Sequence, residues 1–174
     1  PTGSFDAAGF FAAGGEPAID AAGTLTYTVA PDANGTATVQ VVAEDSDGAV
    51  SDPATFVITV NALNDAPVFT LDDAAFSDAP TNTMIDGTED SGAQVLDLVD
   101  TFAAGPATAL DEVGNQALTW VLGTPTFTGS LAFDAFSIDA DGNLTYTPTA
   151  DTSGTATFTL SLQDDGATGG GGVN

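Results

Sequence analysis

The stretch Thr155-Ala-Thr-Phe-Thr-Leu-Ser-Leu162 decides the fold class of this chain. Its four apolar residues alternate with Thr and Ser, which is typical of a strand with one face on a core and the other in water. Threonine suits the outward face because β-branched side chains fit a pleated, half-buried surface. The same alternation recurs at residues 25–29 and 56–60.

The segments between these stretches carry turn signals. Asn-Gly, Asp-Gly, Ser-Gly and Gly-Gly pairs recur along the chain, and no segment holds a helical period with caps. Residues 74–115 give the weakest pattern, and the short strand candidates in and after it are residues 94–98 and 117–122. We therefore predict an all-β chain built of Greek-key, immunoglobulin-like (cadherin-like) β-sandwich repeats in tandem.

An internal repeat supports this prediction. Residues 20–28, Asp-Ala-Ala-Gly-Thr-Leu-Thr-Tyr-Thr, correspond to residues 139–147, Asp-Ala-Asp-Gly-Asn-Leu-Thr-Tyr-Thr, at an offset of 119. The match continues from residues 32–39 to residues 151–158 at the same offset. Upstream, Thr-Gly-Ser at residues 2–4 matches Thr-Gly-Ser at residues 128–130 if the first copy carries an insertion around residues 9–16.

The repeat places a boundary after residue 62. We expect residues 1–62 to be the C-terminal part of one β-sandwich repeat, and residues 63–174 to be the next repeat lacking its last strand. Half a sandwich leaves an apolar face and strand edges exposed. We therefore expect adjoining sequence, or another chain, to supply the missing strands.

The composition excludes many functions. The chain has 25 Asp and Glu residues, no Lys, Arg, His or Cys, and a net charge of −25. It therefore lacks the Ser-His and Cys-His nucleophile systems, Schiff-base lysines and His- or Cys-ligated zinc. Strong negative charge without a basic patch argues against nucleic acid. The sequence holds no apolar run long enough to span a membrane, so we expect no membrane insertion. Composition still permits the paired-carboxylate chemistry of glycosidases, but nothing in the sequence places two carboxylates across a cleft, so we expect no enzyme activity.

A short joint separates the two repeats. It reads Asn61-Ala-Leu-Asn-Asp-Ala-Pro-Val-Phe69, with an apolar strand before it and a new extended segment after it. No cationic side chain exists that could stiffen it. Oxygen-rich Asp and Asn side chains are ligands of Ca²⁺, so we expect Ca²⁺ to bind there.

These residues resemble a known family. Ala-Glu-Asp-Ser-Asp-Gly at residues 43–48 and Asn-Asp-Ala-Pro-Val-Phe at residues 64–69 are similar to the end of a cadherin repeat and its linker. Together with Gly-x-Leu-Thr-Tyr-Thr and Gly-Thr-Ala-Thr, they resemble the bacterial cadherin-like tandem repeats of giant secreted adhesins, including RTX adhesins. The resemblance implies an extracellular or cell-surface location, a spacer role, and Ca²⁺ between repeats.

Loop alternation selects the candidate ligands. In an antiparallel sandwich successive loops alternate between the two ends, so every second loop of each repeat faces the joint. The resemblance places ligands in the same loops, although Asn61 stands where the family has Asp, and residues 32–34 read Asp-Ala-Asn instead of Asp-x-Glu. Asp and Asn are also common turn residues without any metal. The predicted metal ligands are Asp32, Asn61, Asn64, Asp65, Asp111, Glu112, Asp164 and Asp165.

Three functions remain open at the level of sequence. The first is a structural repeat of an adhesin stalk or fibre, stiffened by Ca²⁺ and in contact with adjacent repeats. The second is a subunit of an extracellular filament or sheath, completed by strand exchange with copies of itself. The third is a module that binds a surface glycan or protein; the aromatic residues Trp120, Phe127, Phe133 and Phe136 could form a sugar-stacking face, but we expect them to pack in the core.

Overall fold

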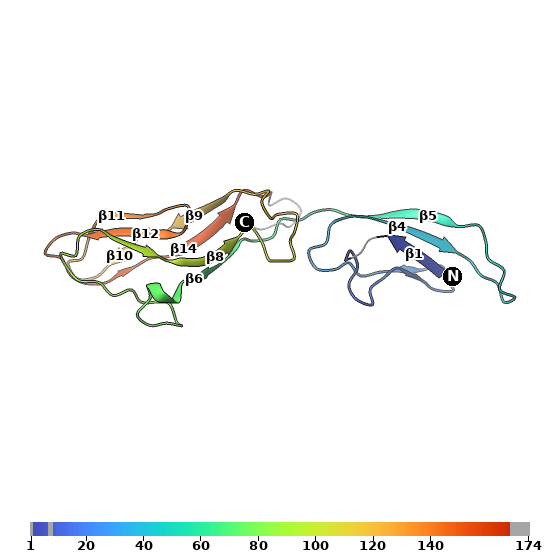
Figure 1. Ribbon diagram of the computed structural model, residues 1–174, viewed down its shortest axis with the longest axis horizontal. Helices are drawn as coiled ribbons and strands as arrows, with labels where there is room; N and C mark the ends of the chain where they lie inside the picture. Colours follow the sequence, from blue (N-terminus) through green and yellow to red (C-terminus); the bar gives the residue numbers. More distant parts are fainter. Residues whose placement is uncertain (1, 7–8, 168–174) are drawn as a thin grey trace.

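The computed structural model describes residues 2–6 and 9–167, and these residues form an all-β structure of two units (Figure 1). The described residues contain no α-helix and one 3₁₀ turn, η1 (Asp73–Ala75). The predicted fold class is confirmed. Figure 1 shows the two units end to end along the long axis, with a thin connection between β5 and β6.

The first unit is a three-stranded antiparallel sheet with a small hairpin beside it. The sheet has the order β1 (Thr2–Asp6), β4 (Gly35–Val42), β5 (Ala54–Val60). The hairpin pairs β2 (Ala18–Ile19) with β3 (Leu25–Thr26). Inward-facing residues of β4 and β5 form a core cluster with two aromatic residues that lie between β1 and β2. The buried members of this cluster are Phe10, Phe11, Ala37, Val39 and Ile58.

The second unit packs several short antiparallel pairings around a larger core. One sheet has the order β11 (Phe133–Ile138), β12 (Asn143–Pro148), β7 (Gln94–Asp97). The remaining pairs are β6 (Val68–Leu71) with β8 (Val99–Ala103), β9 (Leu118–Leu122) with β14 (Leu160–Asp164), and β10 (Thr126–Phe127) with β13 (Ala156–Thr157). The strand candidates at residues 94–98 and 117–122 are confirmed as β7 and β9.

The backbone repeats as the sequence does. Asp32 and Asp151, which are 119 residues apart, both adopt a positive φ, at 56° and 59°. Strand register extends the equivalence. Thr2 pairs with Val42, and Val121 pairs with Ser161, so Thr2 is the counterpart of Val121 and β1 is the counterpart of β9.

This register corrects the sequence alignment at the start of the chain. Matching Thr-Gly-Ser at residues 2–4 to residues 128–130 with an insertion is wrong, because strand pairing keeps the offset of 119 at Thr2. The offset between the two units changes only locally. Phe11 bridges to Val29 in the first unit, and Phe133 pairs with Pro148, the counterpart of Val29 at the offset of 119, in the second. Phe133 therefore takes the place of Phe11, although it lies more than 119 residues after it. A three-residue identity in a turn was weaker evidence than the pairing partners.

The two units differ in how well they bury equivalent residues. Tyr146 on β12 is 9% exposed and lies between β11 and β7, whereas its counterpart Tyr27 is 44% exposed. Among the described residues, no strand takes the place of β7 beside β3 in the first unit. The alternation at residues 25–29 therefore predicted an apolar face that this unit only partly covers.

Candidate functional site

Three polar side chains are buried among the described residues, and all three lie where the two units meet. Asn64 is 9% exposed, Glu112 is 2% exposed and Asp164 is 6% exposed. Asn64 belongs to the linker between β5 and β6, Glu112 to the loop between β8 and β9, and Asp164 ends β14. Burying such groups is unfavourable unless hydrogen bonds replace their contacts with water.

The side chain of Asn64 ties the linker to two segments of the second unit. Its Nδ2 donates a hydrogen bond to Oδ1 of Asp164 at 3.1 Å and to the backbone carbonyl oxygen of Asp65 at 3.3 Å. Its Oδ1 accepts from Nε2 of Gln116 at 2.6 Å. The backbone N–H of Gly166 donates to the same Asp164 oxygen at 2.8 Å. An amide is needed at position 64 because it must both donate and accept.

The carboxylate of Glu112 holds the next residue of the linker. Its Oε1 accepts a hydrogen bond from the backbone N–H of Asp65 at 2.6 Å. Its Oε2 is buried and has no hydrogen-bond partner among the described residues. A β-carbon at position 105 would collide with Oε2, so Gly105 gives this carboxylate its place. Oδ2 of Asp164 and Oε1 of Gln116 in the same network are likewise buried without a hydrogen-bond partner among the described residues.

Contacts between the two units converge on the same place. Oγ1 of Thr108, in the second unit, donates to Oδ2 of Asp32, in the first unit. Burial raises the pKa of the Asp65 carboxyl, and the nearby carboxylates of Asp32 and Asp111 raise it further. Asp32, Asp65 and Asp111 therefore repel one another electrostatically across the joint.

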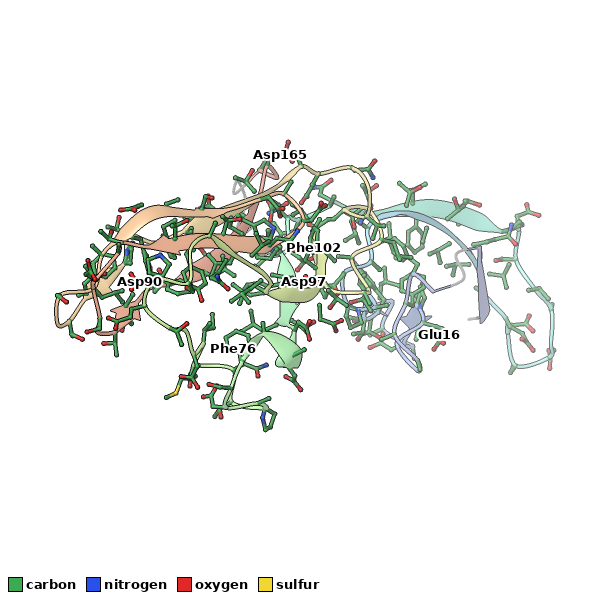
Figure 2. All side chains as sticks on the ribbon, turned by 60° about the vertical axis from the view of Figure 1, so that its left-hand side comes forward. Glu16, Phe76, Asp90, Asp97, Phe102 and Asp165 are labelled. Carbon is green, nitrogen blue, oxygen red and sulfur yellow. The ribbon has the colours of Figure 1, made fainter. Side chains whose placement is uncertain are left out.

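Two predicted ligands, Asp165 and Asn61, make no hydrogen bond to Glu112 among the described residues. Oδ1 of Asp165 accepts from the backbone N–H of Ala117 at 2.8 Å, which closes the start of β9 against the end of β14. Figure 2 shows Asp165 at the outer side of this region. Asn61 is exposed, and the structure gives its side chain no hydrogen bond to the rest of the described chain. Asp165 therefore bonds beside this network, and Asn61 lies outside it.

The donor set at the joint suits a hard, oxygen-bound cation. Carboxylate and amide oxygens are the ligands of Ca²⁺, and the unpartnered Oε2 of Glu112 is such an oxygen. In the part of the chain that the structure describes, however, no three acidic side chains converge closely enough to hold one ion. Ca²⁺ binding thus remains a prediction that requires Asp32, Asp65 or Asp111 to turn toward Glu112.

Several acidic residues outside the joint act as turn formers. Oδ1 of Asp45 accepts from the backbone N–H groups of Asp47 and Ala49 at 3.0 and 2.9 Å. Oδ1 of Asp139 accepts from those of Asp141 and Asn143 at 3.0 and 2.9 Å. Hydrogen bonds from the side chain and backbone of Asn143 lower the pKa of Asp139. These carboxylates therefore have a structural use without any ion.

The other end of the second unit has a related arrangement. The backbone N–H of Asp151, the counterpart of Asp32, donates to Oδ1 of Asp90 at 3.0 Å. Figure 2 shows Asp90 at the end of this unit that lies away from the first unit. Asp32 and Asp151 thus occupy equivalent turns, one of which contacts the second unit and one of which closes a loop within it.

The structure adds three residues that sequence reasoning missed: Gly105, Thr108 and Gln116. They hold Glu112, Asp32 and Asn64 respectively. Alternation of loops identifies acidic ligands but not the neutral residues that position them. Nothing in the local sequence distinguishes Gln116 or Thr108 from other polar loop residues.

Of the four aromatic residues considered for a sugar-stacking face, Trp120, Phe133 and Phe136 pack against the core, whereas Phe127 is 38% exposed and contacts Phe133 from its edge. The ring of Trp120 meets those of Phe69 and Phe102 edge to face, with centroids 5.2 and 5.5 Å apart. Phe133 and Phe136 stack at 5.3 Å within the same core. These contacts favour core packing over a sugar-stacking face.

Comparison with known proteins gives a partial assignment. Residues 2–59 match the family described as a bacterial Ig domain. A search of curated proteins found no match for the chain. The described residues contain no helix long and apolar enough to cross a membrane. The match and the all-β fold together support a bacterial immunoglobulin-like repeat, a class of domain that is typically structural and common in surface proteins.

Proposed function

We propose that the chain is a non-enzymatic spacer in a long bacterial surface or extracellular protein, where immunoglobulin-like units set end to end give length and stiffness. The linker geometry carries this proposal. Asn64 and Asp65 are fixed to the second unit by Asp164 and Glu112, so only residues 61–63 separate β5 from an anchored residue. A connection this short restricts how far the units can bend.

We further propose that Ca²⁺ binds at the joint and stiffens it. Glu112 would hold the ion with one or more of Asp32, Asp65 and Asp111, because their mutual repulsion leaves a site for positive charge. The chain itself has no Lys, Arg or His that could neutralise them. A bound Ca²⁺ would supply positive charge between carboxylates that belong to both units.

Calorimetric titration of the protein with Ca²⁺ tests the ion. The variant Glu112→Gln keeps an acceptor for the Asp65 N–H but loses the charge, and we expect it to weaken binding at least tenfold, which corresponds to about 1.4 kcal/mol. Asp45→Asn is the matched control, because it removes one carboxylate from a turn at the far end of the first unit. Equal affinities for the two variants would contradict the assignment to Glu112.

Spin labels test stiffness separately. The chain has no Cys, so Thr36→Cys in β4 and Val113→Cys in the loop between β8 and β9 give one label on each side of the joint. Both positions are exposed. We expect a narrow distance distribution that narrows further in millimolar Ca²⁺. A broad distribution, unchanged by Ca²⁺ or chelator, would refute the stiff-spacer function.

A further inference from the structure

Among the described residues, one asparagine is followed directly by glycine. The pair Asn34-Gly35 lies between the turn that contains Asp32 and the body of β4, and Asn34 is half-buried. The other described asparagines precede alanine, aspartate, threonine, glutamine or leucine. An asparagine side chain can react with the backbone nitrogen of the next residue, and glycine hinders that approach least because it has no β-carbon. The chemistry of the chain therefore singles out Asn34.

The pair lies at the joint end of the first unit. Gly35 opposite Val60 is the last pair of the β4–β5 ladder, and the chain leaves this ladder through Asn34 on one side and Asn61 on the other. Asp32, two residues before Asn34, makes the contact with the second unit. A charge at position 34 would therefore lie beside the carboxylates of the joint.

The backbone at Gly35 is less crowded than at the equivalent place in the second unit. Gly35 has a φ of 113°, and a β-carbon there would meet no described atom within 4 Å. Its counterpart at the offset of 119, Gly154, lies so close to Thr128 that a β-carbon would collide with the carbonyl group. The carbonyl oxygen of Ser153, the counterpart of Asn34, also accepts a backbone hydrogen bond at 2.9 Å. The first unit therefore leaves more room for the two residues to move.

Hydrogen bonds hold most of the other asparagine side chains in place. The buried amide of Asn64 both donates and accepts. Three further amides donate to neighbouring oxygens at 2.6, 2.8 and 2.9 Å, those of Asn82, Asn115 and Asn143. Among the described residues, the structure gives the side chains of Asn34 and Asn61 no such bond, and only Asn34 precedes glycine.

We propose that Asn34 is a self-modification site of the joint, which converts to aspartate and isoaspartate in the folded protein. The backbone nitrogen of Gly35 loses its proton and forms a bond to Cγ of Asn34. The bond between Cγ and the side-chain nitrogen breaks, and that nitrogen takes up the proton and leaves as ammonia. Water then opens the resulting succinimide ring at either carbonyl, which gives aspartate or, with an extra methylene group in the main chain, isoaspartate.

The fold controls the rate through the end of the ladder. The backbone nitrogen of Gly35 has to leave its place opposite Val60 before it can attack. Terminal pairs of a sheet open at little cost in free energy, whereas pairs in a core open only with the whole domain. We therefore expect folding to slow the reaction by no more than about tenfold relative to a free peptide of residues 30–39.

The conversion changes the charge of the joint. Each event adds one negative charge to a protein whose net charge is −25. This consequence rests on the proposed Ca²⁺ site, because affinity for Ca²⁺ rises with the number of carboxylates around the ion. We expect Asn34→Asp to bind Ca²⁺ about threefold to tenfold more tightly than the natural protein. Gln40→Glu is the matched control, because it adds the same charge at an exposed position farther along β4.

Peptide mapping by mass spectrometry tests the conversion without any cation. The natural protein is kept folded in warm, mildly alkaline buffer with chelator, and the amide at position 34 is followed over time beside the free peptide. An isoaspartate-specific methyltransferase labels the second product. Asn34→Gln is the control, because glutamine would have to close a larger ring. We expect conversion at position 34, and none in this variant or at the exposed Asn61.

Other outcomes would overturn the proposal. An amide that persists at position 34 in the folded protein, while the free peptide reacts, would show that the fold protects the pair. Equal conversion at Asn61 would show general ageing and no special site. Equal Ca²⁺ affinity of Asn34→Asp and Gln40→Glu would show that position 34 does not act on the joint. Absence of Ca²⁺ binding by every variant would refute the proposed ion site and this consequence together, whereas conversion measured in chelator would stand.

Discussion

Replacement of Asn64 by Asp is the sharpest test of the joint. The amide nitrogen that donates to Asp164 at 3.1 Å becomes a second carboxylate oxygen facing the first. The bond from Gln116 can persist, because position 64 still accepts. The substitution therefore changes shape little, reverses the interaction with Asp164 and removes the donor to the carbonyl oxygen of Asp65.

The expected magnitude follows from burial. Loss of a hydrogen bond to a charged group costs about 1.5–3 kcal/mol. Leaving a buried charge without compensation costs about 3–5 kcal/mol, and the two effects overlap because they concern the same Asp164 oxygen. We therefore expect Asn64→Asp to lower the free energy of unfolding by about 3–5 kcal/mol at neutral pH. The deficit should shrink at acidic pH, where one of the two carboxyls takes up a proton.

Urea unfolding followed by Trp120 fluorescence measures this change. Trp120 is the single tryptophan, and it lies on β9 opposite Leu162 of β14, so it reports on the unit that contains Asp164. Asn115→Asp is the control: its side chain donates to the Asp111 carbonyl oxygen at 2.8 Å on the surface, and we expect a loss within about 0.5 kcal/mol. If Asn64→Asp unfolds within about 0.5 kcal/mol of the natural protein, the buried contact with Asp164 is not stabilising and the reasoning fails.

Three further substitutions separate packing from charge. Gly105→Ala should cost about 1–3 kcal/mol in urea unfolding, because its methyl group collides with Oε2 of Glu112; an effect no larger than that of the exposed control Ala107→Ser would contradict this. Asp65 has a raised pKa, so its carboxyl keeps the proton in the folded state at pH values where the unfolded chain has lost it, and the contribution of Asp65 to stability falls as the pH rises above 3.8. Asp65→Asn should remove this fall when the free energy of unfolding is measured against pH in chelator. An unchanged pH dependence would contradict the prediction. Asp139 has a lowered pKa, so its contribution to stability is present above pH 3.8 and is lost as the pH falls through the pKa of the folded state. In thermal unfolding at neutral pH, Asp139→Ala should be less stable than Asp139→Asn, because asparagine keeps an oxygen that accepts from the backbone N–H groups of the turn. Equal stabilities of the two variants would refute the turn role.

The sequence predicted the strands well where side chains alternate. Residues 156–162 and 56–60 lie in strands or directly between two of them, because each stretch has one face on a core. Residues 25–29 alternate just as clearly, yet β3 covers only Leu25–Thr26 and Tyr27 is exposed. Alternation states which side chains are able to be buried, but a neighbouring strand has to be present to bury them.

The candidate site was predictable in location but not in internal contacts. Alternation of loops directed attention to Asp32, Glu112 and Asp164, and the structure places all three where the units meet. Loop alternation could not predict that the Asn64 side chain is a buried hydrogen-bond donor, because amide hydrogen bonds depend on distances that no local pattern encodes. Loop alternation also selects Asp165 as a ligand, which stays a prediction, but it does not predict that Oδ1 of Asp165 accepts a hydrogen bond from the backbone N–H of Ala117.

The single sign of charge links these observations. With no cationic side chain available, the buried carboxylates at the joint accept hydrogen bonds from neutral donors only, one oxygen of Glu112 from the Asp65 N–H and one oxygen of Asp164 from Asn64 and Gly166. Such bonds stabilise a carboxylate without cancelling its charge, so the repulsion among Asp32, Asp65 and Asp111 persists. Salt or a bound cation can lower that repulsion, and neither comes from the chain. The bending stiffness of the joint should therefore follow the ionic environment, with divalent cations acting at lower concentration than monovalent ones because their effect depends on binding as well as screening.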